Sequence, residues 1–271
     1  MHRVFAAALG AFLVLAGAGR AAEQTVSGCA VVAQAPPRIR LAAQTLLAEA
    51  LKPGEARISF IGHASFLIES PAGVAAVTDY NDVMRAAAAP DIATMNKAHS
   101  THNSARPEAG IKHLLRGWSP DGGPARHNLI ERDMRVRNVS TNIRDWGGGT
   151  ERDGNSIFVF ETAGLCIAHL GHLHHTLDPA RLAELGRVDV LMIPVDGSFT
   201  MDQAGMIEVI DQIRAPLMLP MHFFSGASLE RFIARMSGRY EVKRSESGTT
   251  VVSRETLPDK PTLLVLPGRM F

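Results

Sequence analysis

The sequence predicts a mixed α/β fold in which β-sheets are covered by helices, and three observations predict it. The composition, 46% hydrophobic and 20% charged over 271 residues, is that of an ordinary globular protein with a sizeable core. Short β-prone runs punctuated by glycine and proline dominate the first half, which is typical of an antiparallel meander. The second half alternates strand-like and helical segments, which indicates sheets with helices packed on them.

The elements of the first half follow from local spacing. Residues 36–51 have helical spacing of apolar side chains between two proline-containing stretches. A short helix is expected at 108–115 and a glycine-rich loop at 145–154. Strands are predicted at residues 57–62, 64–70, 74–79, 91–97 and 135–141.

In the second half, residues 155–161 and the stretch 164–177 are expected to form a hairpin that ends in a histidine-rich loop. The mostly apolar run at 188–195 suits a strand buried on both faces. The remaining predictions are helices at 178–185, 201–213 and 228–236, a strand at 217–224, and edge strands at 240–243 and 249–253. No repeat, charge run or low-complexity linker marks a boundary, so residues 22–271 are predicted to form one domain.

The N-terminus is typical of a Sec-type signal peptide, predicted to comprise residues 1–21, which makes the protein periplasmic or secreted. Its apolar run is too short for a comfortable membrane span. The stretch that ends at Cys29 resembles a lipobox, so a lipid anchor there is the minor alternative. Export would permit a disulfide with Cys166, although that residue lies in an apolar strand pattern and is interpreted first as a buried hydrophobe. A net charge of +1 gives no reason to expect a nucleic-acid partner, and the sequence leaves the oligomeric state open.

Histidines gather at the ends of three predicted strands. His99 and His102 follow one strand, His172 and His174 follow a second, and His222 lies near the end of a third. Loops at strand ends are where rigid scaffolds hold ligand-binding groups, and imidazole is the commonest metal-binding side chain. The three clusters therefore predict one metal site, against the alternative of a histidine-rich surface loop without a ligand.

A family resemblance rests on the order of several motifs between residues 57 and 224. They are GHASFLI with Thr78-Asp79, AHSTHN, NSIFVFETAGLCIAHLGH, VDVLMIPVDGSFTM and LPMHFF. This order resembles the metallo-β-lactamase fold superfamily, and more narrowly its branch of metal-dependent hydrolases that includes the ascorbate-6-phosphate lactonases. The resemblance implies a four-layer αββα sandwich with a metal site at one edge of the two sheets.

The resemblance also implies a ligand set that this sequence keeps only in part. In the family signature H-x-H-x-D-H, the first histidine corresponds to Lys97 and the aspartate to Thr101. The family's middle histidine falls within residues 141–144, with Arg144 as the best match, and its bridging aspartate corresponds to His172. Because neutral imidazole has one lone pair and cannot bridge two cations, we expect one metal ion instead of a pair.

The imidazoles that remain suit zinc, copper, nickel or iron, and we expect one divalent transition metal, most readily zinc. The predicted ligands are His99, His102, His172, His174 and His222. Three ligands with an open position, the favoured arrangement, would be catalytic geometry, whereas four closed ligands would be structural. The predicted supporting or substrate-pocket residues are His63, Asp79, Lys97, Asn142, Arg144 and His175. Asp196, after the buried strand, is interpreted as a turn residue in preference to a general base.

The leading functional hypothesis is an exported metal-dependent hydrolase. A metal-activated water would attack a small ester, lactone, amide or phosphoester, with the general acid unassigned. The altered ligands also motivate a non-hydrolytic binding or sensing protein, and the all-imidazole set a copper or iron redox protein. A fold alone does not decide among these functions.

Overall fold

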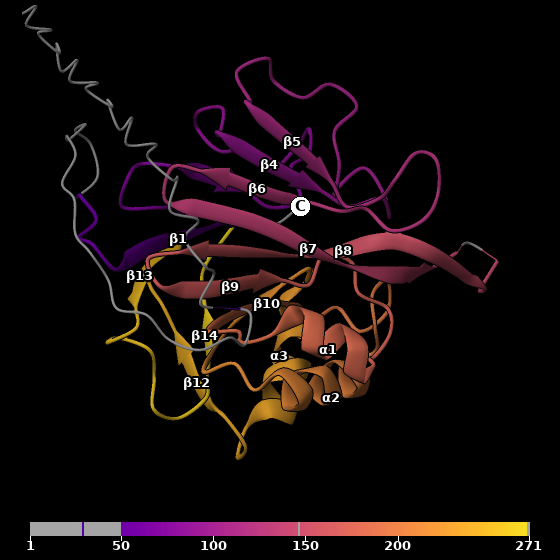
Figure 1. The fold of residues 1–271 in the computed structure, drawn as a ribbon. Coiled ribbons are helices and arrows are strands. Elements are labelled where there is room, and N and C mark those ends of the chain that lie inside the picture. Colours follow the sequence, from indigo (N-terminus) through magenta and orange to yellow (C-terminus); the bar gives the residue numbers. More distant parts are fainter. Residues whose placement is uncertain (1–28, 30–49, 146, 270–271) are drawn as a thin grey trace, which may run out of the picture.

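Two β-sheets packed face to face form the molecule in the computed structural model, which describes Cys29 and residues 50–145 and 147–269 (Figure 1). The first sheet has the order β13 (Thr249–Ser253), β1 (Glu55–Gly62), β2 (Ser65–Glu69), β3 (Ala75–Val77), β4 (Ile92–Met95), β5 (His113–Arg116). The second has the order β12 (Glu241–Arg244), β14 (Thr262–Val265), β11 (Leu217–Met221), β10 (Val190–Pro194), β9 (Leu165–His169), β8 (Thr150–Thr162), β7 (Met134–Arg144), β6 (Asn128–Glu131).

The main core lies between the two sheets. Strand β1 alternates half-buried and buried residues along its whole length, because every second side chain points at the other sheet. Its Ile58 and the neighbouring Phe66 meet Phe158 and Phe160 of β8, and all four are fully buried. Burial of each such side chain stabilises the fold by about 1.5–3 kcal/mol, which fixes how the sheets face each other.

The helices cover the outer face of the second sheet. In Figure 1, α1 (Pro179–Leu185), α2 (Gln203–Ile213) and α3 (Gly226–Met236) lie together below that sheet. Met206 of α2 and Phe232 of α3 are fully buried against strands β7 to β11 and β14. Asp178 and Asp202 cap the first two helices by accepting backbone N–H groups of the first turn. The outer face of the first sheet carries a smaller cluster around Tyr80 and Met95.

Parallel pairing brings several strand ends to one edge of the sandwich. Strands β9, β10 and β11 run parallel, and all their residues are buried, as expected for strands covered on both faces. Strand β4 of the first sheet pairs in parallel with both β3 and β5. The carboxyl ends of β4, β9 and β11 lead directly into the histidine-bearing turns.

The sandwich confirms the predicted fold, and the differences are local. The helix predicted at 108–115 is wrong, because residues 113–116 form β5 and pair with β4. The glycine-rich loop is shorter than predicted, since β8 begins at Thr150 and extends the β7–β8 ribbon. Strands β6 and β14 were not predicted, because such four-residue strands carry almost no periodic signal. The predicted signal peptide and the helix at 36–51 lie outside the described residues, apart from the last two positions of that helix.

A disulfide joins Cys29 to Cys166 in β9, with their Cα atoms 5.9 Å apart. The first interpretation of Cys166, as a buried hydrophobe without a bond, is therefore wrong, although its side chain is fully buried. A thioether-linked lipid on Cys29 is incompatible with this bond, because both need the same sulfur. Among the described residues, no helix is long and apolar enough to cross a bilayer.

Candidate metal centre

Four imidazoles converge at the edge where the strands end. His99 and His102 come from the turn after β4, His172 from the turn after β9, and His222 directly follows β11. One ring nitrogen from each lies within 4.8 Å of the other three. These four residues, called the histidine cluster below, were all predicted from the sequence. His174, also predicted as a ligand, is not among the converging four.

Two members of the histidine cluster have carboxylates behind them. His102 Nδ1 lies 2.5 Å from Asp79 Oδ2, and His222 Nδ1 lies 3.1 Å from Asp196 Oδ1. The two Nε2 atoms of these rings face each other at 3.0 Å. A carboxylate favours a ring proton on the nitrogen that faces it, so each Nδ1 carries the proton and each Nε2 presents a lone pair, although only the His102 contact has the geometry of a hydrogen bond. Two lone pairs at that distance repel unless a cation lies between them, so the residues present fit a metal ion.

The other pair is linked through its own neighbours. His99 Nε2 lies 3.0 Å from His172 Nε2, and His99 Nδ1 lies 2.7 Å from Thr101 Oγ1. The same hydroxyl lies 3.1 Å from His63 Nε2. On the far side, His172 Nδ1 lies 2.8 Å from His174 Nε2. Thus Thr101, at the position where the family has an aspartate, acts as a neutral hydrogen-bonding link.

Unusual backbone conformations hold several of these residues. His63, Asp79 and His222 all have positive φ, at 52°, 41° and 58°, which is uncommon for residues other than glycine. The His222 N–H donates to the His63 carbonyl at 2.6 Å, which ties the turns after β1 and β11 together. Such strained residues are found mostly at functional sites, where the surrounding structure holds them in place.

Gly171 lets the turn after β9 approach the first sheet. Its φ is +61°, and a Cβ there would lie 2.4 Å from Asn96 Nδ2 and 2.5 Å from Asn155 Oδ1. Asn155 accepts the His172 backbone N–H at 2.8 Å and donates to the Leu170 carbonyl at 3.1 Å. The glycine and the buried amide together place His172 in the cluster.

Burial dominates the electrostatics of the site. It lowers the pKa of His63 to about 2 and that of His102 well below its ordinary value, so both rings are neutral. It raises the pKa of Asp79 to about 6, although nearby histidines oppose the shift. Burial would also raise the pKa of Asp196, but the neighbouring His222 ring and hydrogen bonds from Thr200 and Ser198 lower it instead. The site at neutral pH therefore combines neutral imidazoles with carboxylates behind them, which is what metal binding requires.

Asp196 has a larger role than the predicted turn. Its Oδ2 accepts the backbone N–H groups of Ser198, Phe199 and Thr200, which is the predicted turn function. Its Oδ1 nevertheless faces His222, so one carboxylate does both. The sequence signal was an aspartate immediately after a buried strand, but only the fold shows which histidine it meets.

The remaining predicted residues do not join the cluster. Lys97 forms an ion pair with Glu151. The Arg144 guanidinium donates to the carbonyls of residues 198, 199 and 200 at 2.8, 3.2 and 3.3 Å. Asn142 accepts the Asp153 N–H at 3.1 Å, and the His175 ring centroid lies 6.4 Å from that of His174. His169 is structural, since its Nε2 lies 2.8 Å from the Ala64 carbonyl oxygen.

Two exposed phenylalanines stand beside the cluster. The Phe224 ring lies 5.1 Å from that of His63 and 5.3 Å from that of His222, between centroids. Phe199 packs edge-on against Phe224 at 5.2 Å. Their exposed fractions are 59% for Phe199 and 43% for Phe224, which is unusual for this residue type. The metal-binding edge therefore has an apolar aromatic rim, which the sequence did not indicate.

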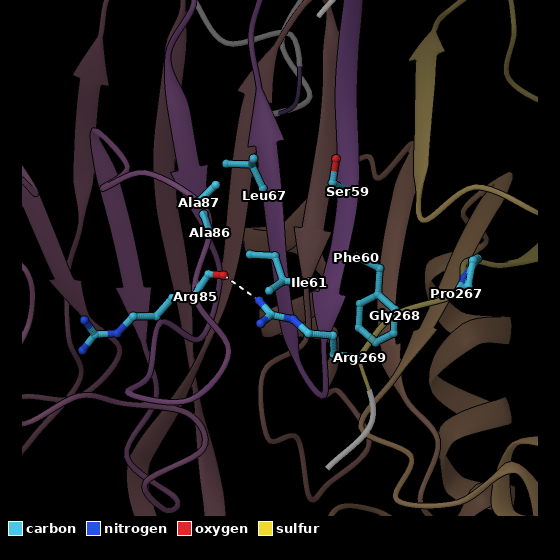
Figure 2. A pocket seen from close by; sticks show the side chains of 10 residues that line it. All are labelled: Ser59, Phe60, Ile61, Leu67, Arg85, Ala86, Ala87, Pro267, Gly268 and Arg269. Atoms are coloured by element: carbon cyan, nitrogen blue, oxygen red, sulfur yellow. Dashed lines mark hydrogen bonds between the residues drawn. The ribbon is translucent and has the colours of Figure 1, made fainter. Parts of the chain in front are cut away.

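The pocket drawn in Figure 2 is a poorer candidate for a catalytic site than the histidine cluster. It measures about 520 Å³ and is lined by β1 and β2 together with residues 85–87 and 267–269. Arg85 pairs with Asp82 and Glu108, and Arg269 donates to the Arg85 carbonyl, as the dashed line shows. The Ser59 hydroxyl is hydrogen-bonded to Thr249. No histidine lines this pocket, so the histidine cluster is the stronger candidate.

Comparison with known proteins finds a matching family model and relatives named as metal-dependent hydrolases. The model of the beta-lactamase superfamily domain matches residues 57–222, which span every residue of the histidine cluster. A metal-dependent hydrolase of the UPF0173 group from Methanoculleus marisnigri is 25% identical, and the match covers 79% of this chain and 98% of the relative.

Solved structures share the fold. A candidate Zn-dependent hydrolase of the metallo-β-lactamase superfamily from Thermotoga maritima superposes with a TM-score of 0.60 at 24% identity, covering 79% of this chain and all of that one. A metallo hydrolase from Ignicoccus hospitalis gives a TM-score of 0.52 at 14% identity, covering 79% and 97%. At these identities, the likeness concerns the fold alone.

Proposed function

The chain belongs to the beta-lactamase superfamily, and from this premise we propose that it is an exported metal-dependent hydrolase that acts on an uncharged ester, lactone or amide with an apolar group. The observation that carries the proposal is the convergence of four imidazoles from three strand ends, with Asp79 and Asp196 behind two of them. Zinc is the proposed ion, because imidazole ligands oriented by carboxylates are typical of zinc sites.

A divalent cation in such a site lowers the pKa of water to about 7 and polarises a carbonyl group. The chain's own residues orient the imidazole rings and shield them from water. Asp79 fixes the ring of His102, and Asp196 is placed to do the same for His222. The buried surroundings lower the pKa of His102 and keep its ring neutral, so its lone pair remains available for the metal. The relatives named as metal-dependent hydrolases support the same reaction class.

The charges around the site favour an uncharged substrate over a phosphoester. Lys97 and Arg144 are the cationic members of the predicted supporting or pocket residues, but Glu151 pairs with Lys97, and three carbonyl oxygens accept hydrogen bonds from Arg144. The exposed rings of Phe199 and Phe224 instead favour an apolar substituent beside the reacting group. Covering part of one such ring contributes about 1 kcal/mol to binding, or about a fivefold change in KM.

Export is part of the proposal, and two features support it. The N-terminal residues have the charge, apolar run and small residues of a signal peptide. The disulfide between Cys29 and Cys166 is a bond that persists in oxidising compartments and is rare in the cytosol.

The test measures metal content and hydrolysis on the same samples. Mature protein without a His-tag is analysed by elemental mass spectrometry and assayed on p-nitrophenyl esters of increasing acyl length, with a p-nitrophenyl phosphodiester alongside. We expect about one equivalent of metal, turnover of the esters and little of the phosphodiester.

The variants His102→Ala and His113→Ala form a matched pair, because His113 lies outside the cluster, 3.1 Å from Glu131. His102→Ala is expected to lose metal and turnover, and His113→Ala to keep both. Phe224→Ala is expected to raise KM for the longest ester more than for the shortest. Wild-type protein that takes up no metal, or turnover that survives metal removal, would refute the proposal.

A further inference from the structure

The four rings of the histidine cluster are not equivalent, because their second ring nitrogens meet different partners. Asp79 and Asp196 face the Nδ1 atoms of His102 and His222 and can only accept a proton. Both rings therefore present the Nε2 lone pair that a metal needs. His172 has no carboxylate partner in this position; its Nδ1 faces another imidazole, that of His174, at 2.8 Å.

The protonated nitrogen of His174 is fixed by the main chain. The backbone N–H of Arg144, at the end of β7, donates to His174 Nδ1. A backbone amide is always a donor, so this Nδ1 cannot carry a proton. A neutral imidazole has one ring proton, and in His174 it must lie on Nε2. That N–H donates to His172 Nδ1.

The same reasoning passes to His172 and onwards. Its Nδ1 accepts, so its ring proton lies on Nε2, the atom that points into the cluster. His99 Nε2 accepts this proton at 3.0 Å, which makes His99 Nδ1 the donor to Thr101 Oγ1 at 2.7 Å. The Thr101 hydroxyl then donates to His63 Nε2 at 3.1 Å. All the hydrogen bonds from Arg144 to His63 thus run in one direction.

We propose that His99, His102 and His222 are the metal ligands and that His172 presents its Nε2–H to the substrate as a hydrogen-bond donor. The donor role of His172 toward a substrate rests on the proposed function. The assignment of the metal ligands rests only on the hydrogen-bond geometry. Coordination through His172 Nε2 would require removing the ring proton that the Arg144 amide and His174 hold there. His99 has no ring proton on Nε2, so a metal needs only to replace the hydrogen bond that this lone pair accepts from His172.

With these three ligands, a bound metal would keep an open position next to the His172 N–H. Three protein ligands with one position open are the geometry of catalytic zinc sites, whereas four ligands close the site. Without a metal this N–H donates to His99 Nε2; once an ion takes the His99 lone pair, the N–H would be free to donate to a substrate oxygen on which negative charge develops during acyl transfer. A preorganised donor in this place contributes about 10²- to 10³-fold to kcat. His174 is a positioning residue that acts through His172.

Metal affinity distinguishes a donor from a ligand. The dissociation constant for Zn²⁺ is measured by competition with a chromophoric chelator in wild type, His102→Ala and His172→Ala. We expect His102→Ala to weaken binding by more than about 100-fold, and His172→Ala by less than about threefold with a kcat lower by about 10²-fold. Equal weakening by both variants would overturn the assignment.

The tautomer can be observed directly, even where a variant fails to fold. Long-range ¹H–¹⁵N spectra of wild-type protein labelled at histidine report which ring nitrogen carries the proton, with and without Zn²⁺. We expect His172 to be protonated on Nε2 in both states. In His174→Ala, which removes the partner of His172 Nδ1, we expect the proton to move to Nδ1 and Zn²⁺ to bind more tightly. A loss of packing alone would not tighten binding. Coordination through Nε2 of wild-type His172 would overturn the assignment.

The two proposals fail separately. Protein that binds Zn²⁺ through His99, His102 and His222 but hydrolyses none of the esters refutes the hydrolase and supports the ligand assignment. Wild-type hydrolysis together with loss of metal in His172→Ala refutes the assignment and leaves the hydrolase intact. The spectra of the metal-free protein test the tautomer even if no metal binds.

Discussion

Breaking the disulfide between Cys29 and Cys166 should remove a large part of the stability of the fold. The bond joins residues 137 positions apart in the sequence. In the loop-closure model, a cross-link over a loop of that length restricts the unfolded chain enough to stabilise the folded state by about 5 kcal/mol at 25 °C. Because a folded domain is typically stable by only about 5–15 kcal/mol, the expected loss is a major fraction of the total.

The assay compares urea unfolding of oxidised wild type, reduced wild type and Cys29→Ala. Cys29→Ala removes the cross-link and some packing of a buried side chain, whereas reduction removes only the cross-link, so the two together separate the effects. We expect the free energy of unfolding to fall by about 5 kcal/mol in the reduced protein and Tm to fall by roughly 10–20 °C. A difference below about 1 kcal/mol between oxidised and reduced protein would refute the reasoning, as would two free thiols in protein purified from the periplasm.

Three further predictions concern the metal-binding edge. Asp79→Asn should weaken metal binding by about 10- to 100-fold, because the carboxylate that accepts the hydrogen bond of His102 Nδ1 is lost. The control Asp211→Asn changes a carboxylate paired with Arg239 and Tyr240 and should leave metal affinity unchanged. Chelator competition measures the affinity of both variants. Gly171→Ala should destabilise the fold by about 1–3 kcal/mol in urea, because its Cβ would collide with Asn96 and Asn155, whereas Gly122→Ala meets open space and bears only the backbone strain. Metal-free protein should lose stability as the pH falls from 7 to 5. Because the pKa values of His63 and His172 are lowered in the folded state, that state binds fewer protons than the unfolded state below pH 6.5, and each ring that stays neutral costs about 2 kcal/mol of stability at pH 5. Protonation of Asp79, whose pKa is raised to about 6, offsets about 1 kcal/mol of this loss. A flat pH profile in urea titrations would contradict the last prediction.

The sequence by itself predicted sheets covered by helices and a gathering of histidines at one edge of them. The alternation in β1 and the continuous apolar run of β10 follow from how a strand is buried on one face or on both. Histidines directly after β4, β9 and β11 could be recognised as one cluster, because strand ends of a packed sandwich meet at an edge. Local patterns sufficed because burial and strand geometry repeat along the chain.

Only the tertiary structure decided how the residues at that edge divide their roles. Nothing in the sequence indicates a partner for Lys97 or Arg144. In the fold, Lys97 pairs with Glu151 of β8, and the Arg144 guanidinium donates to three carbonyl oxygens of residues 198–200. Asp196 read as a turn, and the Cys29–Cys166 pair could not be inferred from spacing. Which nitrogen of His172 carries its proton depends on an amide in another strand, at Arg144. Each of these outcomes is a contact between residues distant in sequence, and the pattern of neighbours along the chain contains no information about such contacts.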